Sequence, residues 1–111
     1  MKRATLGELE QLLMLAVVRL GDEAYGARIQ QELESIVARS LSISTVYVTL
    51  VRLEKKGLVC SRRADPTPVR GGKAKRIFAL TRGGVAALED ARAVLERMWK
   101  RVETLPEFRS S

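Results

Sequence analysis

Apolar residues in the first part of the chain recur at the spacing of an α-helix. One stripe over residues 6–20 consists of Leu6, Leu9, Leu13, Ala16 and Leu20. Leu12, Leu15 and Val18 widen that stripe beyond a single face. A helix that is apolar on two sides usually packs against two surfaces. We therefore expect this helix either at the centre of the chain's own core or between that core and a partner subunit.

Two further helices are predicted before residue 57. Asp22 is expected to cap the first of them, over residues 25–38, and a short extended strand is expected at residues 39–42. Ser42 or Ser44 then caps the next helix, which runs to about Lys56. Its inward-facing stripe is predicted to be Ile43, Val46, Leu50 and Leu53. Gly57 follows as a stop signal.

The pattern then changes to short alternating segments. Residues 58–63 and 76–80 are predicted strands, and the segment between them is too rich in proline and glycine for regular structure. Thr81 caps a long last helix that is expected to reach about Glu103. The expected fold class is mostly α with a small β-hairpin. The order of the elements along the chain predicts a winged helix-turn-helix. We expect that domain at residues 1–82, a C-terminal dimerisation helix at 83–105 and a tail at 106–111.

The last helix also repeats apolar residues every seven positions. Leu88, Leu95 and Val102 are seven apart, and Ala91, Met98 and Leu105 follow each of them by three. These spacings match the a and d positions of a coiled coil over two and a half heptads. The predicted homodimer interface consists of Leu9, Leu12, Leu88, Ala91, Leu95, Met98, Trp99 and Val102. Packing of this helix onto the chain's own core is the alternative.

Positive charge is concentrated in one third of the chain. The sequence has 20 basic and 13 acidic residues, a net charge of +7. Residues 52–82 hold ten basic and two acidic residues, a charge of +8, and the other residues hold ten basic and eleven acidic ones, a charge of −1. Such a concentrated field suits a polyanion such as double-stranded DNA. A solvated basic face and an anionic membrane surface are the alternatives, although the latter usually involves a basic amphipathic helix.

The composition excludes several kinds of chemistry. The chain has no histidine and only one cysteine, Cys60, which excludes an intramolecular disulfide, a Cys/His metal cluster and histidine-dependent triads. We therefore expect no enzyme activity, cofactor or metal. The longest apolar run, residues 12–18, is far shorter than the ~20 residues of a membrane span. Glu8 and Glu10 interrupt what would be a signal peptide, so a cytoplasmic location is expected.

The third helix and the hairpin are the candidate DNA-binding elements. On the helix, the residues expected to face DNA are Ser44, Thr45, Tyr47, Val48, Thr49 and Arg52. Hydroxyl groups and arginine can bind bases or phosphates, and Val48 could contact a thymine methyl group. On the hairpin, the expected contacts are Arg62, Arg63, Arg70, Lys73, Lys75 and Arg76 around the glycines at 71–72. An ordinary amphipathic helix and a solvated hairpin are the alternatives.

Several stretches resemble PadR-type transcriptional regulators. They are residues 6–15 (LGELEQLLML), 25–29 (YGARI), 44–59 (STVYVTLVRLEKKGLV), 71–72, 75–76 and 79–84 (ALTRGG). The resemblance implies a winged helix and a homodimer built through the first and last helices. It also implies a palindromic operator and repression, relieved in some members by phenolic acids or planar drugs.

The resemblance also assigns roles to residues. By position, Tyr47 and Arg52 carry the family's DNA contacts, and Lys73, Lys75 and Arg76 carry its wing contacts. Two features depart from the family pattern. Phe78 stands where many members have tyrosine, and a single C-terminal helix is typical of the short subgroup rather than of the longer regulators.

Two other functions remain open from the sequence. A winged helix can also serve as a protein-interaction module without binding DNA. Trp99, beside the heptad seam, is first a packing anchor, and in a ligand-sensing regulator it would wall a pocket for a small planar molecule between subunits. Cys60 is expected to be a small buried residue, with a redox-sensitive thiol as the alternative.

Overall fold

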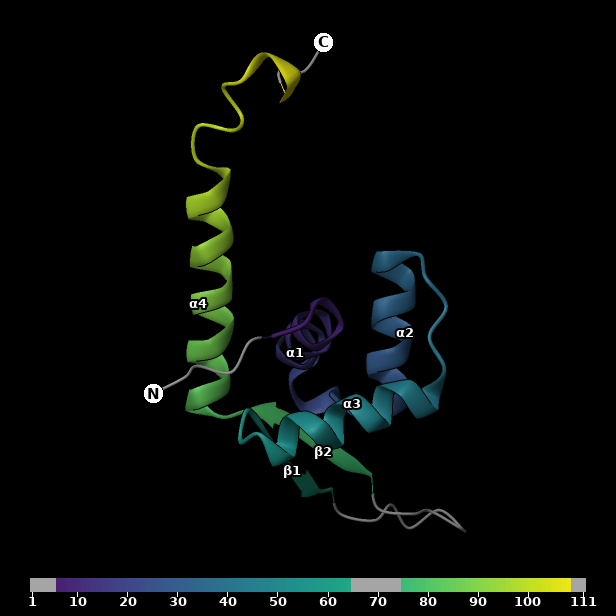
Figure 1. The fold of residues 1–111 in the computed structure, drawn as a ribbon. Coiled ribbons are helices and arrows are strands. Elements are labelled where there is room, and N and C mark those ends of the chain that lie inside the picture. Colours follow the sequence, from purple (N-terminus) through teal and green to yellow (C-terminus); the bar gives the residue numbers. More distant parts are fainter. Residues whose placement is uncertain (1–5, 65–74, 109–111) are drawn as a thin grey trace.

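Helices form most of the structure, and a single β-hairpin lies on one side of them (Figure 1). The computed structural model describes residues 6–64 and 75–108. The α-helices are α1 (Glu8–Leu20), α2 (Gly26–Val37), α3 (Ile43–Lys55) and α4 (Arg82–Trp99). The strands are β1 (Val59–Arg63) and β2 (Arg76–Leu80), and short 3₁₀ turns lie at Gly21–Glu23 (η1) and Pro106–Phe108 (η2). The predicted fold class, mostly α with a small β-hairpin, is confirmed.

Helix α1 lies at the centre of the core, which is one of the two placements that its apolar pattern left open. It contacts α2, α3, β2 and α4. Leu13, Met14 and Val17 on this helix are buried. The other elements cover them with Ile29 and Leu33 of α2, Val46, Leu50 and Leu53 of α3, and Phe78 of β2. Leu15 and Val18 remain about half exposed, so the second apolar side of α1 is left partly open by the described elements.

Local signals set the ends of α3 and α4. The Ser42 hydroxyl accepts a hydrogen bond from the Thr45 backbone N–H at 3.0 Å, which satisfies one of the free donors at the start of α3. Thr81 caps α4 in the same way through the Gly84 N–H, also at 3.0 Å. After α3, Gly57 adopts a φ of 76°, a left-handed conformation that glycine takes at little cost. The chain can therefore turn directly into β1.

Two expectations for the segments around α2 were wrong. Asp22 does not cap this helix, because α2 begins only at Gly26 and Asp22 lies in η1. Residues 39–42 do not form the expected strand. The Gln30 side chain donates to the Leu41 carbonyl at 2.6 Å, and the Leu41 N–H donates to Glu34 at 3.2 Å. Side chains of α2 thus satisfy the backbone of this connection, which leaves no role for a pairing strand.

The hairpin is antiparallel and is attached to the helices at both strands. Its register pairs Val59 with Leu80 and Arg63 with Arg76. The Phe78 N–H also donates to the Ala24 carbonyl at 2.8 Å, which joins β2 to the segment before α2. This bond fixes the middle of β2, and the hairpin lies alongside α3, which β1 contacts (Figure 1).

Helix α4 projects away from the rest of the chain (Figure 1). Its first turns pack on the core through Ala87, Leu88 and Ala91, whereas its later residues are mostly exposed. The helix ends at Trp99 and not near Glu103 as expected, because Lys100 is extended and Arg101 has a φ of 72°. The chain bends there, and the Phe108 ring packs edge-on against Trp99 with 6.2 Å between the ring centroids.

Candidate nucleic-acid interface

Helix α3 presents one row of side chains directly to solvent. At about 100° per residue, positions 44, 48, 51 and 55 lie on the side opposite the buried residues. This outer row consists of Ser44, Val48, Val51 and Lys55, all of which are exposed. Tyr47 and Arg52 lie on its two flanks and are also exposed. Most of the predicted recognition residues therefore share one open surface.

Two predicted orientations on α3 were wrong. Thr49 was expected to face DNA but is buried, with 4% of its surface exposed, and its hydroxyl donates to the Thr45 carbonyl at 2.8 Å. It lies three residues after Val46 and four before Leu53, which places it on the inner face. Ile43 was expected to face inward but is exposed. Val51 was not predicted to face solvent, although it lies three residues after Val48 and seven after Ser44, a spacing that places all three on one side of the helix.

Tyr47 is held against the start of α2. A Cβ atom on Gly26 would lie 2.4 Å from Cζ of the Tyr47 ring, so the absence of a side chain at Gly26 makes room for this tyrosine. Tyr47 is still 43% exposed. The tyrosine therefore lies where α2 and α3 meet, on the same face as the outer row. The role of Gly26 was not predicted, because it depends on a residue 21 positions further along the chain.

Three of the basic residues on the described part of the hairpin have partners within the protein, and Arg63 differs from them. Arg62 pairs with Asp22 at 3.6 Å, and Arg76 pairs with Glu54 at 3.1 Å and also donates to the Ser61 hydroxyl at 2.6 Å. Lys75 lies 4.1 Å from the centre of the Tyr25 ring, a cation–π contact. Arg63 forms no ion pair with any described carboxylate. Arg70, Lys73 and the glycines at 71–72 lie outside the described residues.

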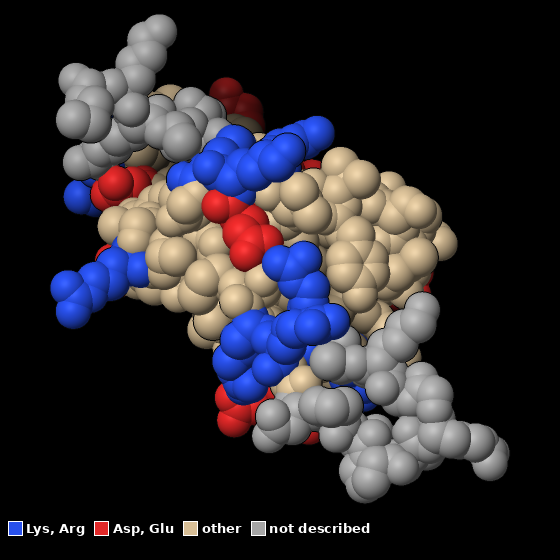
Figure 2. Space-filling view, turned by 90° about the horizontal axis from the view of Figure 1, so that it is seen from below, with Lys and Arg blue, Asp and Glu red and all other residues tan. Residues whose placement is uncertain are grey.

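The basic side chains gather on the face formed by α3 and the hairpin. Viewed from below in Figure 2, this face carries several groups of lysine and arginine, with a few acidic side chains among them and a broad uncharged surface beside them. Arg52 and Lys55 belong to it, and within residues 6–64 and 75–108 no carboxylate forms an ion pair with either of them. The face therefore keeps cations that are available to an anionic partner.

A partly buried ion pair connects the basic face to α1. Lys56 donates to Glu10 Oε2 at 2.8 Å, and the Gly7 N–H donates to Glu10 Oε1 at 2.9 Å. Burial by itself raises the pKa of the Glu10 carboxyl. The hydrogen bonds from Lys56 and Gly7 and the positive charges of Lys56 and Arg52 together outweigh that effect, so the pKa lies below its ordinary value. Glu10 is thus ionised at neutral pH and ties the start of α1 to the end of α3.

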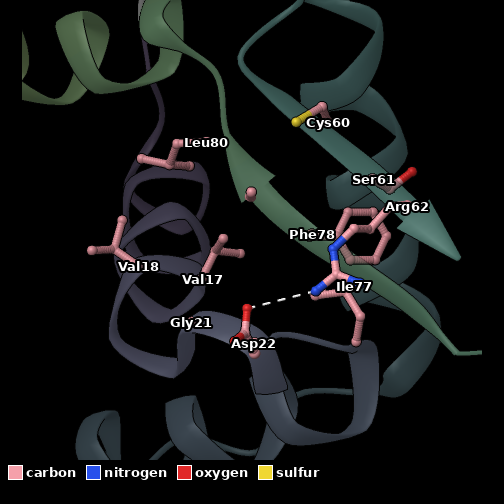
Figure 3. A pocket seen from close by; sticks show the side chains of 11 residues that line it. Val17, Val18, Gly21, Asp22, Cys60, Ser61, Arg62, Ile77, Phe78 and Leu80 are labelled. Atoms are coloured by element: carbon pink, nitrogen blue, oxygen red, sulfur yellow. Dashed lines mark ion pairs between the residues drawn. The ribbon is translucent and has the colours of Figure 1, made fainter. Parts of the chain in front are cut away.

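A small pocket of about 300 Å³ lies beside the hairpin (Figure 3). Val17 and Val18 of α1 line one side, and Cys60 and Arg62 of β1 line the other. Cys60 is exposed, so the prediction that it is buried was wrong. Side chains alternate along β1, and Val59 takes the buried position, whereas Cys60 lies on the opposite face, where it borders this open pocket.

The predicted dimer residues divide into covered and open positions. Leu9, Leu12, Leu88 and Ala91 pack against the chain's own core. Leu95, Met98 and Trp99 are 53%, 70% and 49% exposed. Val102 is half-buried but lies beyond the end of α4. The heptad pattern of the sequence therefore continues past the last residue of the helix. The expectation of a planar ligand at Trp99 stays a prediction.

An apolar groove borders the open part of α4. It has a volume of about 690 Å³ and lies between the N-terminal part of α1 and α4. Leu6, Ala87, Val94 and Leu95 are among the residues that line it. The Val94 position was not predicted as part of this face, because it lies outside the a and d positions of the heptad.

A helix-turn-helix with an exposed third helix and a basic hairpin beside it defines the winged-helix class of transcriptional regulators. Comparison with known proteins agrees with that class. The profile of the family described as "Transcriptional regulator PadR-like family" matches residues 14–90. The chain therefore belongs to the PadR-like family of transcriptional regulators, whose members bind DNA.

Similar proteins support the assignment over most of the chain. The transcriptional regulator Rv3488 of Mycobacterium tuberculosis is 38% identical over 81 residues, which cover 73% of this chain and 71% of that protein. The structure of a PadR-like transcription factor from Bacteroides fragilis superposes with a TM-score of 0.70 at 25% identity, covering 86% and 87% of the two chains. A PadR family regulator from Clostridium difficile gives a TM-score of 0.64 at 29% identity, covering 88% and 96%.

No membrane-spanning segment was found in the described ranges, where no helix combines the necessary length and apolar character.

Proposed function

We propose that this regulator is a homodimeric repressor that acts in the cytoplasm at a palindromic operator. The observation that carries the proposal is that Lys55 of the outer row of α3, and Arg52 and Arg63 near that row, form no ion pair with a carboxylate of the described residues. Phosphate groups of a duplex would neutralise these cations, and the release of counterions would drive binding. The outer row could then reach the base edges in the major groove.

The uncovered face of α4 supports the homodimer. Leu95 and Met98 are more than half exposed, and the apolar groove continues this face toward α1. Large apolar side chains grouped in this way commonly mark an interaction surface. A second copy of the chain carries the same face, so a two-fold arrangement would cover both copies at once.

A two-fold dimer also predicts the form of the operator. Two copies of α3 would enter successive major grooves on one side of the duplex, about 34 Å apart. The preferred site would then be an inverted repeat with half-sites one helical turn apart. Occupation of such a site within a promoter would block transcription, which is the repressor mechanism that we propose.

Selection of bound sequences from a random duplex library tests this proposal. We expect enrichment of an inverted repeat by the wild-type protein, and loss of enrichment when Arg52 and Arg63 are both changed to alanine. The matched control changes Arg92 and Arg97 to alanine, because these arginines lie on α4 away from the basic face. Enrichment of single half-sites would contradict the dimer. Self-association without any duplex binding would instead favour a protein-interaction module.

A further inference from the structure

The two central positions of the outer row of α3 are valines. Val48 is 56% exposed and Val51 is 40% exposed, between Ser44 at one end of the row and Lys55 at the other. Val48 and Val51 also line a shallow depression with Tyr47, Arg52 and Lys55. The part of α3 that points furthest from the core is therefore apolar at its middle.

This composition is unusual for a helix face that meets only water or phosphate. Solvated helix faces are normally polar, and a face that binds only phosphate would carry cations or hydrogen-bond donors at its centre. Valine has neither, and its β-branched side chain slightly lowers helix propensity. The two valines are thus suited to an apolar partner group within a strongly polar surface.

The charges that flank the row indicate which partner carries that group. Arg52 and Lys55 adjoin the valines and form no ion pair with a described carboxylate, so the surface as a whole fits a polyanion. A DNA duplex presents a methyl group in its major groove, the 5-methyl group of thymine. No other base displays one there.

We propose that Val48 and Val51 recognise thymine by contact with its 5-methyl group, an inference that rests on the proposed binding of duplex DNA. Three residues of helix separate the two valines by about 4.5 Å along the helix axis. Neighbouring base pairs are separated by about 3.4 Å. The two valines therefore contact the same thymine or the thymines of two adjacent base pairs, and each operator half-site contains thymine there.

Replacement of thymine by uracil tests this inference, because it removes the methyl group and keeps every hydrogen-bonding group of the base. The probe is the duplex most enriched by the selection, synthesised with deoxyuridine in place of thymidine at one position at a time. For the wild-type protein we expect the dissociation constant to rise about three- to fivefold at one or two positions of each half-site.

Variants of the two valines complete the test. In Val48→Ala and Val51→Ala, the effect of uracil should shrink at the position that the altered valine contacts. Val18→Ala is the matched control, because Val18 is an equally exposed valine on α1. It should keep the full effect of uracil.

The possible failures are distinguishable from one another. Tight duplex binding that is indifferent to uracil at every position overturns the inference and leaves the proposed function standing. An equal uracil effect in the wild type and both valine variants overturns it as well. Unchanged DNA binding in both valine variants would assign the row to a protein partner. Absence of any duplex binding by the wild-type protein overturns the proposed function together with the inference.

Discussion

At the scale of single residues, Glu10 joins two parts of the molecule that have different tasks. Its carboxylate receives one hydrogen bond from Gly7 at the start of α1 and one from Lys56 at the end of α3. Helix α1 borders the apolar groove, and α3 carries the outer row. The position of α3 relative to α1 therefore depends in part on the charge of one buried side chain.

Removal of that charge should destabilise the protein in a pH-dependent way. The pKa of Glu10 is lower in the folded protein than in the unfolded chain, so its ionised form contributes stability above the ordinary glutamate pKa of about 4.3. That contribution is lost as the pH falls through the lower, folded pKa. Glu10→Gln should lower the free energy of unfolding by about 1–2 kcal/mol at pH 7.

Urea unfolding of the wild type and Glu10→Gln at pH 7 and near pH 3 measures this difference. The two proteins should differ at pH 7 and converge at the acid pH. Glu8→Gln is the control, because Glu8 is an exposed residue on the same helix turn. A difference that persists unchanged at acid pH would contradict the assigned role of the charge.

Single residues also show where sequence patterns were insufficient. The inner face of α3 was predicted from a stripe that began at Ile43, yet Ile43 is exposed and Thr49 is buried. Periodicity establishes that a helix is amphipathic, but its rotation about its own axis depends on which elements cover it. The exposure of Cys60 has the same origin, since nothing in the sequence near β1 shows which face of the hairpin is covered.

At the scale of elements, the contact between α4 and the turn before β1 depends on one glycine. Gly84 is buried, and a Cβ atom there would lie 2.0 Å from the Leu58 carbonyl oxygen. Backbone atoms cannot move aside as a flexible side chain can. Gly84 thus permits the close approach of α4 to the winged-helix domain.

Alanine substitutions at two adjacent glycines separate this contact from helix propensity. Gly84→Ala should destabilise the protein by roughly 1–3 kcal/mol, because α4 must shift to relieve the clash. In Gly83→Ala the new Cβ atom would be 3.6 Å from the nearest atoms, an ordinary contact, so the change should be neutral or stabilise by up to about 1 kcal/mol. Thermal unfolding of both variants measures the difference. Equal effects at the two positions would contradict the close contact.

Hydrogen bonds to Glu54 fix the hairpin to α3. Glu54, near the end of α3, accepts from Ser61 of β1 at 2.8 Å and from Arg76 of β2 at 3.1 Å. Arg76 is therefore paired within the protein, whereas Arg63 on the adjacent strand has no ion pair among the described residues. We expect Arg76 to position the hairpin and Arg63 to bind phosphate.

The salt dependence of duplex binding distinguishes these two roles. Arg63→Ala should reduce the slope of log affinity against log salt by about 1 per subunit, because one phosphate contact is lost. Arg76→Ala should weaken binding with little change in that slope. Equal reductions of the slope in the two variants would show that Arg76 also binds phosphate.

Most elements could be predicted because their signals are local. The Ser42 and Thr81 caps, the glycine at 57 and the alternation over residues 76–80 gave the helix and strand ends to within a few residues. The Glu54–Arg76 pair spans 22 positions, and no local pattern predicts it. The heptad likewise continued to Leu105, although the helix ends at Trp99, where the chain bends to bring Phe108 onto the tryptophan.

At the scale of the whole molecule, the proposed repressor consists of two copies of the chain. Helix α4 extends beyond the core, and none of the described elements covers Leu95 and Met98 on its outer part. Placement of charges at both positions should prevent a partner from packing there. Because both side chains are more than half exposed, the fold of the single chain should remain intact.

Sedimentation equilibrium tests this requirement. The wild type should have the mass of a dimer, and the double variant Leu95→Asp with Met98→Asp should have the mass of a monomer with an unchanged helical circular dichroism spectrum. Arg97→Asp is the control, because position 97 lies on the opposite side of α4 and should leave the dimer intact. A double variant that remains dimeric would place the interface elsewhere.

In the proposed function, the molecule binds duplex DNA through cations around α3 and the hairpin that form no ion pair with a described carboxylate. The most direct measurement is the affinity of the wild-type protein for its selected duplex as a function of salt concentration. With Arg52, Lys55 and Arg63 of two subunits engaged, log affinity should fall against log salt with a slope of about −5 or steeper. An affinity that does not change with salt would contradict the account.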